Sequence, residues 1–386
     1  MQPATAILIL FVLFAAYSFL SLGAVFLLAI NTDSVDEHLR GHDECENDAS
    51  VKSVSAIVPC RNEVGDIRNC IDSLLAQDYP LLEIVVADGN SEDGTWDILQ
   101  SYGDRIRAIR EGERPHGWTG KNWGAYLGYG ASGGEILLFV DGDMVLSREA
   151  VSVSVRSMLH EGADMLSLGP KMVMKGFWEK LMLPLFAQFI LLLYRPPLMN
   201  RDRGRSAMAN GQFMMMKRAS YEKCGTHEAI RGKVVEDVNL ARLFRRNSMK
   251  IRFFWASNYL ATRMYKRFGE LWEGIVRDIQ GEVGRNYRTH LAGMLYLAFT
   301  FYFPFFMLYF SVIEWNPPLF VLALASLAFV LLRMLILQVG MGSPKYMALL
   351  FPLSVGVYLA MSMCAFLRAA TGQNVLWKDR NYSMNM

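Results

Sequence analysis

The sequence lacks several features that would point at once to a familiar class of protein. Its five cysteines form no CxxC pair and its six histidines are scattered, with His38 and His42 in an acidic stretch, so no structural zinc site is expected. The formal net charge is only +2 and there is no concentrated basic stripe, so nucleic acid is not an expected partner. The cysteines are expected to be reduced packing residues in a reducing compartment.

Long apolar runs, in contrast, are abundant. Hydrophobic residues make up 52% of the 386 residues, and they gather at the N-terminus and after residue 290. Residues 4–30 are uncharged and long enough to cross a bilayer as a helix, and the absence of a basic start argues against a cleaved signal peptide. Three further apolar stretches, near 291–313, 317–339 and 346–369, are divided by the turn-forming NPP and GSP.

The expected organisation is therefore membrane, soluble domain, membrane. It comprises an N-terminal transmembrane anchor (1–30), a linker with little to bury (31–52), an α/β domain (53–290), C-terminal transmembrane helices (291–370) and a tail (371–386). Within the domain, segment 177–199 is apolar with aromatic and basic edges and contains Pro184, which favours an interfacial helix or hairpin over a true span.

From Ser53 onward, short apolar strands alternate with helices. The runs SVSAIVP, LEIVVADG, RIRAIRE and EILLFVDGD are typical of strands, and the first helix has one apolar face (Ile67, Cys70, Ile71, Leu74, Leu75). This alternation predicts right-handed βαβ units and a parallel sheet, which makes the fold class α/β. Ligands bind at the carboxyl ends of the strands in such sheets, and these ends carry the polar PCRNE, ADGNSED and DGD.

Asp141 and Asp143 follow the strand EILLFV. Two carboxylates two residues apart point to the same side, and a turn at this place can aim both at one cation. Mg²⁺ and Mn²⁺ accompany phosphoryl groups and prefer carboxylate oxygens. A DxD pair alone is weak, because acidic pairs are common in turns, but its position after a buried strand favours a metal site.

Other polar residues at the strand ends suit nucleotide recognition. Asp88 ends the second strand, where its carboxylate is placed to accept hydrogen bonds from a base or ribose. Arg61, Asn62 and Glu63 follow the first strand in the same way. Asn62 equally suits a capping role, as do the serine and aspartate that follow Asp88.

The segment HGWTGKNWG, residues 116–124, is rich in glycine. Gly117 and Gly120 let the backbone approach a ligand closely, and Lys121 is placed to pair with a phosphate. The segment does not fit the P-loop pattern, and an ordinary capped helix start is the alternative.

Glu236 and Asp237 open the helical stretch EDVNLARLFRRN. Acidic residues are favoured in a first helical turn by the helix dipole, so a purely structural role is a strong alternative. The functional interpretation makes Asp237 a general base. The preceding NGQFMMMKR is expected to be a strand that places Asn210, Gly211 and Gln212 near the same pocket.

Taken in order, PCRNE, ADGNSEDGT, GWTGKN, FVDGD, NGQFMMMKR and VVEDVNLAR resemble the motifs of family 2 glycosyltransferases with the GT-A (Rossmann-like) fold. The resemblance runs from about Ser53 to Tyr265. It is closest to membrane-bound members that act on carotenoid, hopanoid or ceramide-type lipids, and the terminal WKDRNY is similar to that subgroup as well.

The resemblance implies an inverting hexosyltransferase that uses a UDP-sugar donor, a membrane lipid acceptor and Mg²⁺ or Mn²⁺, with its catalytic domain in the cytoplasm. It implies that Asp141 and Asp143 bind the metal and that Asp237, with Glu236, is catalytic. The implied nucleotide-sugar site is made of Pro59, Arg61, Glu63, Asp88, Lys121, Asn122, Asp141, Gly211 and Gln212.

The (Q/R)xxRW element of processive synthases and ceramide glucosyltransferases is absent, which counts against a polysaccharide synthase. A nucleotidyltransferase usually needs a Gly/Arg/Lys-rich loop after its first strand, and PCRNE does not supply one. A non-catalytic membrane scaffold stays open, although the intact DGD and ED pairs argue against it. Three C-terminal spans would place the basic tail outside, against the positive-inside tendency, so the number of full spans is also open.

Overall fold

The computed structural model describes residues 3–30, 34–39, 52–194, 200–202, 207–283, 287–371, 373, 375–377 and 380–382. Parts of the expected linker, of segment 177–199 and of the C-terminal tail lie outside these residues. The chain divides into two compact units, one of Thr32–Val173 and Tyr194–Met264, the other of Met1–Asn31, Met174–Leu193 and Tyr265–Met386. The expected domain boundaries, which follow the chain in linear order, stay predictions.

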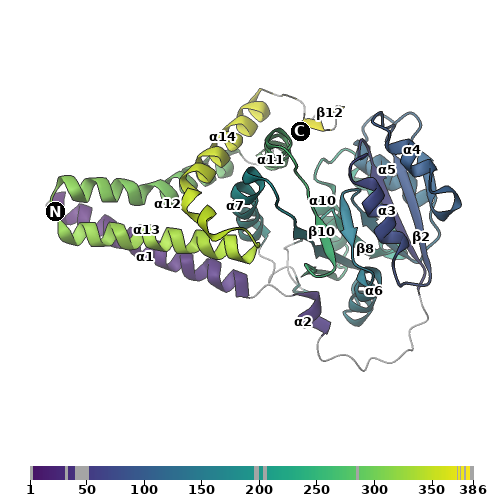
Figure 1. The fold of residues 1–386 in the computed structure, drawn as a ribbon, viewed down its shortest axis with the longest axis horizontal. Coiled ribbons are helices and arrows are strands. Elements are labelled where there is room, and N and C mark those ends of the chain that lie inside the picture. Colours follow the sequence, from purple (N-terminus) through teal and green to yellow (C-terminus); the bar gives the residue numbers. More distant parts are fainter. Residues whose placement is uncertain are drawn as a thin grey trace. The chain divides into compact units, whose positions relative to one another are not determined.

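The first unit is built on a seven-stranded sheet with the order β3-β2-β1-β4-β8-β6-β9. Strands β2 and β8 of this sheet are labelled in Figure 1. Its strands are β1 (Val54–Cys60), β2 (Leu82–Asp88), β3 (Arg107–Arg110), β4 (Ile136–Val140), β6 (Met165–Gly169), β8 (Phe213–Lys217) and β9 (Ile251–Trp255). The α/β class is confirmed. The sheet is mixed rather than wholly parallel, because β8 runs antiparallel to both β4 and β6. Strand–helix alternation predicts crossovers, but it does not fix the direction of a strand that follows a long irregular segment.

Helices cover both faces of this sheet. They are α3 (Ile67–Leu75), α4 (Thr95–Gln100), α5 (Gly120–Gly130), α6 (Ala150–His160), α9 (Arg218–Lys223) and α10 (Glu236–Arg246), with 3-10 turns η1 (Gly103–Arg105) and η2 (His227–Ile230). Along β1, Ala56 and Val58 join one buried cluster and Ile57 joins the other. The two-sided core explains why β1 is an almost continuous apolar run.

A small second sheet lies in the same unit and has the order β5-β10-β7. It consists of β5 (Met144–Leu146), β10 (Leu260–Thr262) and β7 (Lys171–Met172). Because β5 begins directly after Asp143 and pairs with β10, this sheet brings the end of β10 to the acidic turn after β4.

Part of the expected linker is folded onto the first unit. Ser34 forms a bridge with Trp255, and the short helix α2 (Val35–Leu39) follows it. Val35 is fully buried in the core, and Asp36 accepts a hydrogen bond from the hydroxyl of Tyr259 (2.5 Å). The expectation that this stretch has little to bury is therefore wrong for residues 34–39, because one valine in a polar stretch is enough to dock it.

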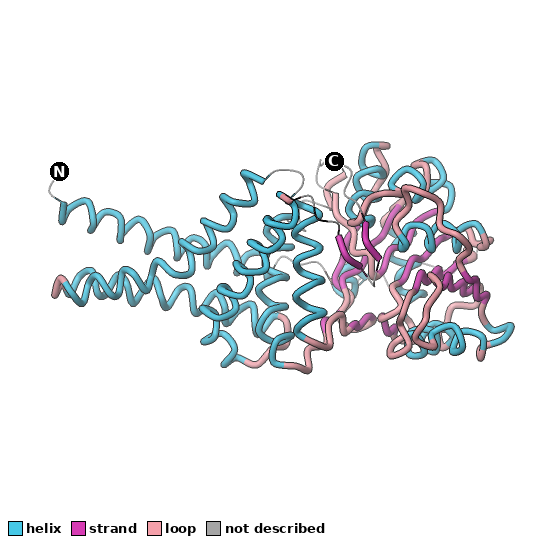
Figure 2. Tube along the Cα trace, turned by 90° about the horizontal axis from the view of Figure 1, so that it is seen from above, coloured by secondary structure: helices cyan, strands magenta, loops and turns pink. Residues whose placement is uncertain are grey.

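The second unit is mainly helical (Figures 1 and 2). Four of its helices are long and apolar enough to cross a membrane: α1 (Pro3–Ile30), α12 (Tyr287–Ile313), α13 (Pro317–Gly340), and α14 (Phe351–Ala370) with the preceding turn η3 (Lys345–Leu350). It also contains α7 (Phe177–Tyr194), α11 (Phe268–Val283) and the strands β11 (Val375–Trp377) and β12 (Arg380–Tyr382). These four helices agree with the four apolar stretches found in the sequence.

Helix α7 runs unbroken through Pro184, so no hairpin turn lies within Phe177–Tyr194. Its Gln188 is buried, and with its amide oxygen facing α13 it accepts hydrogen bonds from Arg333. The interfacial placement of α7 stays a prediction.

Candidate active site

The acidic turn after β4 is held in place by neighbouring strands. The backbone N–H of Asp141 donates to the carbonyl of Gln212 (3.3 Å), and the hydroxyl of Thr262 donates to Oδ2 of Asp143 (3.1 Å). The Gln212 side chain donates in turn to Thr262 (3.4 Å). Thr262 is a positioning residue that sequence reasoning missed, because nothing in the short strand LAT marks it.

The donor atoms of this turn fit Mg²⁺ or Mn²⁺. Asp141 and Asp143 are both only partly buried, and each offers carboxylate oxygens, the ligands that these hard cations prefer. Oδ1 of Asp141 already lies 2.6 Å from the Lys121 ammonium, so this carboxylate is positioned to face a positive charge.

Lys121 links the acidic turn after β4 to the start of α10. It lies at the start of α5, whose N-cap is Thr119, and its Nζ contacts Asp141 (2.6 Å) and Oε1 of Glu236 (2.8 Å). Burial alone would lower the pKa of Lys121, but the two carboxylates raise it above its ordinary value. Lys121 is therefore a fixed cation between the β4 turn and α10, and its predicted contact with a phosphate stays a prediction.

The adjacent acids Glu236, which is buried, and Asp237, which is partly buried, differ in electrostatic environment. Burial alone would raise the pKa of Glu236, but the Lys121 ammonium holds it below its ordinary value. Burial and the negative charge of Glu236 raise the pKa of Asp237 to about 7. A carboxylate with this pKa can take up a proton near neutral pH, which is what a general base must do.

Two backbone N–H groups hold the carboxylate of Asp237. Gly211 donates to Oδ2 (2.8 Å) and Val238 donates to Oδ1 (2.7 Å). A methyl group at Gly211 would lie 2.8 Å from Oε1 of Glu236, 3.1 Å from Nζ of Lys121 and 3.3 Å from Oδ2 of Asp237. A side chain at this position would therefore have to displace the charged ends of these three side chains.

A small cavity with room for about one water molecule opens beside this network. Its lining includes Pro59, Lys121, Asp141, Gly211, His227 and Glu236. His227 is buried and hydrogen-bonded to the hydroxyl of Tyr221 (2.6 Å), and burial lowers the pKa of His227 to about 4. Sequence reasoning missed His227, which has no local motif around it.

Two predicted nucleotide-sugar residues in the loops after β1 and β2 already have protein partners. Arg61 donates to the carbonyls of Gly89 (2.5 Å) and Asn90 (2.8 Å), which ties the loop after β1 to the loop after β2. The Asp88 carboxylate is fully buried and accepts hydrogen bonds from the backbone and hydroxyl of Ser91.

Asn122 is fully buried, and its side-chain amide donates to the carbonyls of Ile230 (2.9 Å), Arg231 (3.1 Å) and Lys233 (3.1 Å). It therefore fixes the loop that precedes α10. Glu63 lies in the loop after β1, where its backbone N–H donates to the hydroxyl of Thr95 (2.9 Å). Contacts of all these residues with a nucleotide stay predictions.

Comparisons with known proteins place this geometry in a family. Residues 55–225 match the family described as Glycosyl transferase family 2. This part of the chain is a family 2 glycosyltransferase domain. The match includes the β4 turn, Lys121 and Gly211, and it ends before Glu236 and Asp237. The family resemblance seen in the sequence is thereby confirmed.

Two curated relatives are similar to a larger part of the chain. The 4,4'-diaponeurosporenoate glycosyltransferase of Staphylococcus haemolyticus (strain JCSC1435) is 24% identical over 231 residues, 59% of this chain and 61% of the relative. The protein of the same name from Staphylococcus aureus (strain USA300) is 25% identical over 237 residues, 60% of this chain and 62% of the relative. The chain thus matches about three fifths of the length of these relatives.

A solved structure also shares the fold. It is a mannosyltransferase from Pyrobaculum calidifontis in complex with GDP-Man and Mn²⁺, with a TM-score of 0.51 and 17% sequence identity. The similarity covers 94% of this chain and 99% of that chain. This chain therefore shares its fold with that mannosyltransferase.

Proposed function

We propose that this chain is an inverting hexosyltransferase that moves a sugar from a nucleoside-diphosphate donor to a lipid in the membrane. The proposed donor is a UDP-sugar. The observation that carries the proposal is the junction at Lys121. One ammonium contacts both the acidic turn expected to hold the donor's diphosphate and the helix that begins with the candidate base.

In the proposed reaction, Asp237 takes the proton from an acceptor oxygen as that oxygen bonds to the anomeric carbon. The bond between that carbon and the diphosphate breaks on the opposite side, which inverts the configuration. Glu236 keeps its negative charge beside Lys121 and sustains the basicity of Asp237. Asp141 and Asp143 would hold the Mg²⁺ or Mn²⁺, which neutralises charge on the departing diphosphate.

A lipid acceptor is supported by two observations. The domain is framed in the sequence by helices long and apolar enough to span a membrane, and its relatives are named for transfer to 4,4'-diaponeurosporenoate. Under this proposal the catalytic domain faces the cytoplasm. The mannosyltransferase of similar fold holds GDP-Man with Mn²⁺, so guanosine donors belong in the test beside uridine donors.

The test is mass spectrometry of lipids from membranes that contain the full chain and are offered UDP- and GDP-hexoses with Mn²⁺ or Mg²⁺. The expected result is a lipid product heavier by one hexose residue that is absent with Asp237→Asn. Transfer only to water-soluble acceptors would overturn the lipid assignment. Donor turnover that is unaffected by Asp237→Asn would overturn the role of the base.

A further inference from the structure

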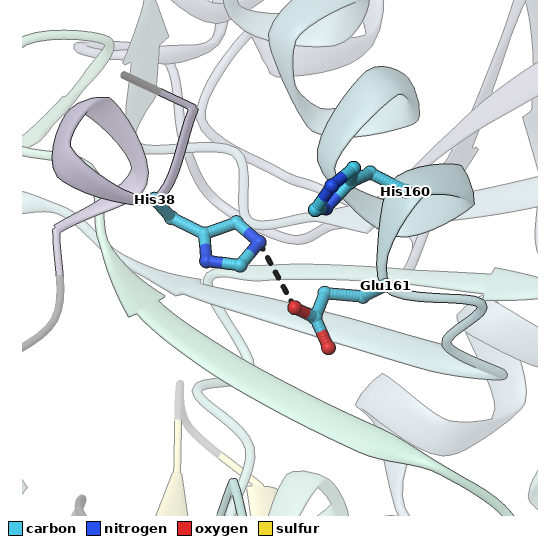
Figure 3. A group of neighbouring side chains, drawn as sticks. All are labelled: His38, His160 and Glu161. Atoms are coloured by element: carbon cyan, nitrogen blue, oxygen red, sulfur yellow. Dashed lines mark ion pairs between the residues drawn. The ribbon is translucent and has the colours of Figure 1, made fainter. Parts of the chain in front are cut away.

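Three potential metal ligands meet on the first unit within the set of residues that the structure describes. His38 comes from the end of α2, and His160 and Glu161 come from the end of α6 (Figure 3). One ligand atom from each lies within 4.8 Å of the other two. We propose that this cluster is a transition-metal site, with Zn²⁺ as its expected occupant, which fastens α2 to the glycosyltransferase domain.

The donor chemistry selects the metal. Two imidazoles and one carboxylate are typical ligands of Zn²⁺, whereas Mg²⁺ and Mn²⁺ are usually bound by oxygens alone. The cluster therefore differs in metal preference from the Asp141–Asp143 turn. A water molecule would complete a four-coordinate site.

The distances require only small movements. Nε2 of His38 lies 3.0 Å from Oε1 of Glu161, and two ligand atoms about 2.0 Å from a tetrahedral zinc are about 3.3 Å apart. His160 is exposed, so its side chain can turn toward the other two. The His38 and His160 rings already meet edge to face with centroids 5.4 Å apart.

The surroundings hold the ligands and favour a cation. The His38 ring stacks on Phe254 at 4.5 Å, and Arg252 donates to Oε2 of Glu161, which leaves Oε1 directed toward the histidine. Such outer partners orient metal ligands. His160 is the last residue of the eleven-residue helix α6, whose C-terminal dipole attracts positive charge.

Two bases beside the cluster are paired with acids. Lys250 lies 3.5 Å from Oε2 of Glu161, and Arg252 also pairs with Asp202 (2.9 Å). The sequence concealed this site, because His38 lies far from His160 in the chain and the spacing fits no motif.

The experiment measures zinc content and cobalt absorption of the full chain, purified in detergent with excess Mg²⁺ to occupy the Asp141–Asp143 turn. About one zinc per chain is expected, and Co²⁺ should give the absorption of a tetrahedral site. His160→Ala should abolish both, while the remaining His38–Glu161 pair keeps α2 docked. Glu149→Gln, an exposed change at the other end of α6, should alter neither.

Thermal unfolding provides a second measurement. Added zinc should raise the Tm of the unaltered chain and of Glu149→Gln but not that of His160→Ala. Zinc retention or stabilisation that persists in His160→Ala would overturn the proposal. So would a chain that binds no zinc and responds only to pH, because that result would leave His38 and Glu161 as a simple ion pair.

Discussion

The two halves of the sheet differ in how they hold their polar groups. In the parallel half, around β1 and β2, Arg61 and Asp88 are fixed by backbone and serine partners before any ligand is considered. In the half around the antiparallel strand β8, with the helix α10 beside it, Asp237 is also held by backbone N–H groups. Its pKa, however, is raised to about 7 by burial and by the negative charge of Glu236. The first half is suited to binding and the second to moving a proton.

Lys121 joins these halves, because its ammonium contacts one acid in each of them. It lies 2.6 Å from Asp141 on the binding side and 2.8 Å from Glu236 on the reacting side. If the division is correct, changes on the two sides should affect different steps.

The largest effect is expected on the binding side. Asp143→Asn should abolish metal-dependent donor binding and leave the fold intact, because it removes one of two carboxylates after β4. Calorimetry of UDP binding with and without Mn²⁺ measures this, with the exposed Asp104→Asn as the matched control. Unchanged metal dependence in Asp143→Asn would separate the acidic turn from donor binding.

On the reacting side, Asp237→Asn should leave donor affinity nearly unchanged and lower turnover by about 10²-fold or more, because it removes only proton abstraction. Steady-state rates and UDP calorimetry on the same preparation separate the two quantities. If donor affinity fell in parallel with turnover, or if Glu236→Gln were crippling and Asp237→Asn benign, the division into halves would fail.

The sequence predicted the binding half well, because parallel strands leave a local signal. Each of β1, β2 and β4 is a short apolar run, and the polar residues that follow it lie at one edge by topology. Local pattern also predicted β8 and the start of α10. Thr262 and His227 were missed because their roles arise only from strand pairing and burial.

A different limitation applies to residues whose position was predicted but whose partners were not. Asn122 was assigned to the nucleotide from its motif, yet its amide binds three carbonyls of the 230–233 loop. Gly211 was placed near the pocket, but the groups that a side chain there would meet, Glu236 and Lys121, come from distant segments. Such contacts have no signature in a single sequence.

Gly211→Ala tests that close approach and should have an intermediate effect. The added methyl would press on Glu236 and Lys121 and shift Asp237, so turnover should fall by about 10- to 100-fold. The matched control is Gly130→Ala, because Gly130 is exposed and an added Cβ there would meet open space. Gly103→Ala is unsuitable, because the φ of Gly103 is positive. A fully active Gly211→Ala would show that the network tolerates displacement.

The smallest effect concerns pH. The proposed base Asp237 would have to be unprotonated to act, so kcat/KM should fall about tenfold per pH unit below its pKa, which lies at about 7. Glu236→Gln removes the neighbouring negative charge that helps to raise this pKa, so the acid limb should move to lower pH even though the plateau is reduced. Glu228→Gln, an exposed change in η2, should leave the limb in place.

The direction of that movement is decisive because two explanations of the limb predict opposite outcomes. If the limb reports Asp237, losing Glu236 makes deprotonation easier and activity persists to lower pH. If it reported Glu236 itself, whose pKa is held below its ordinary value beside Lys121, the limb would vanish in Glu236→Gln. Profiles of kcat/KM, measured at saturating metal and normalised to each plateau, distinguish a shifted limb from a missing one, and thereby show which of the two adjacent acids moves the proton.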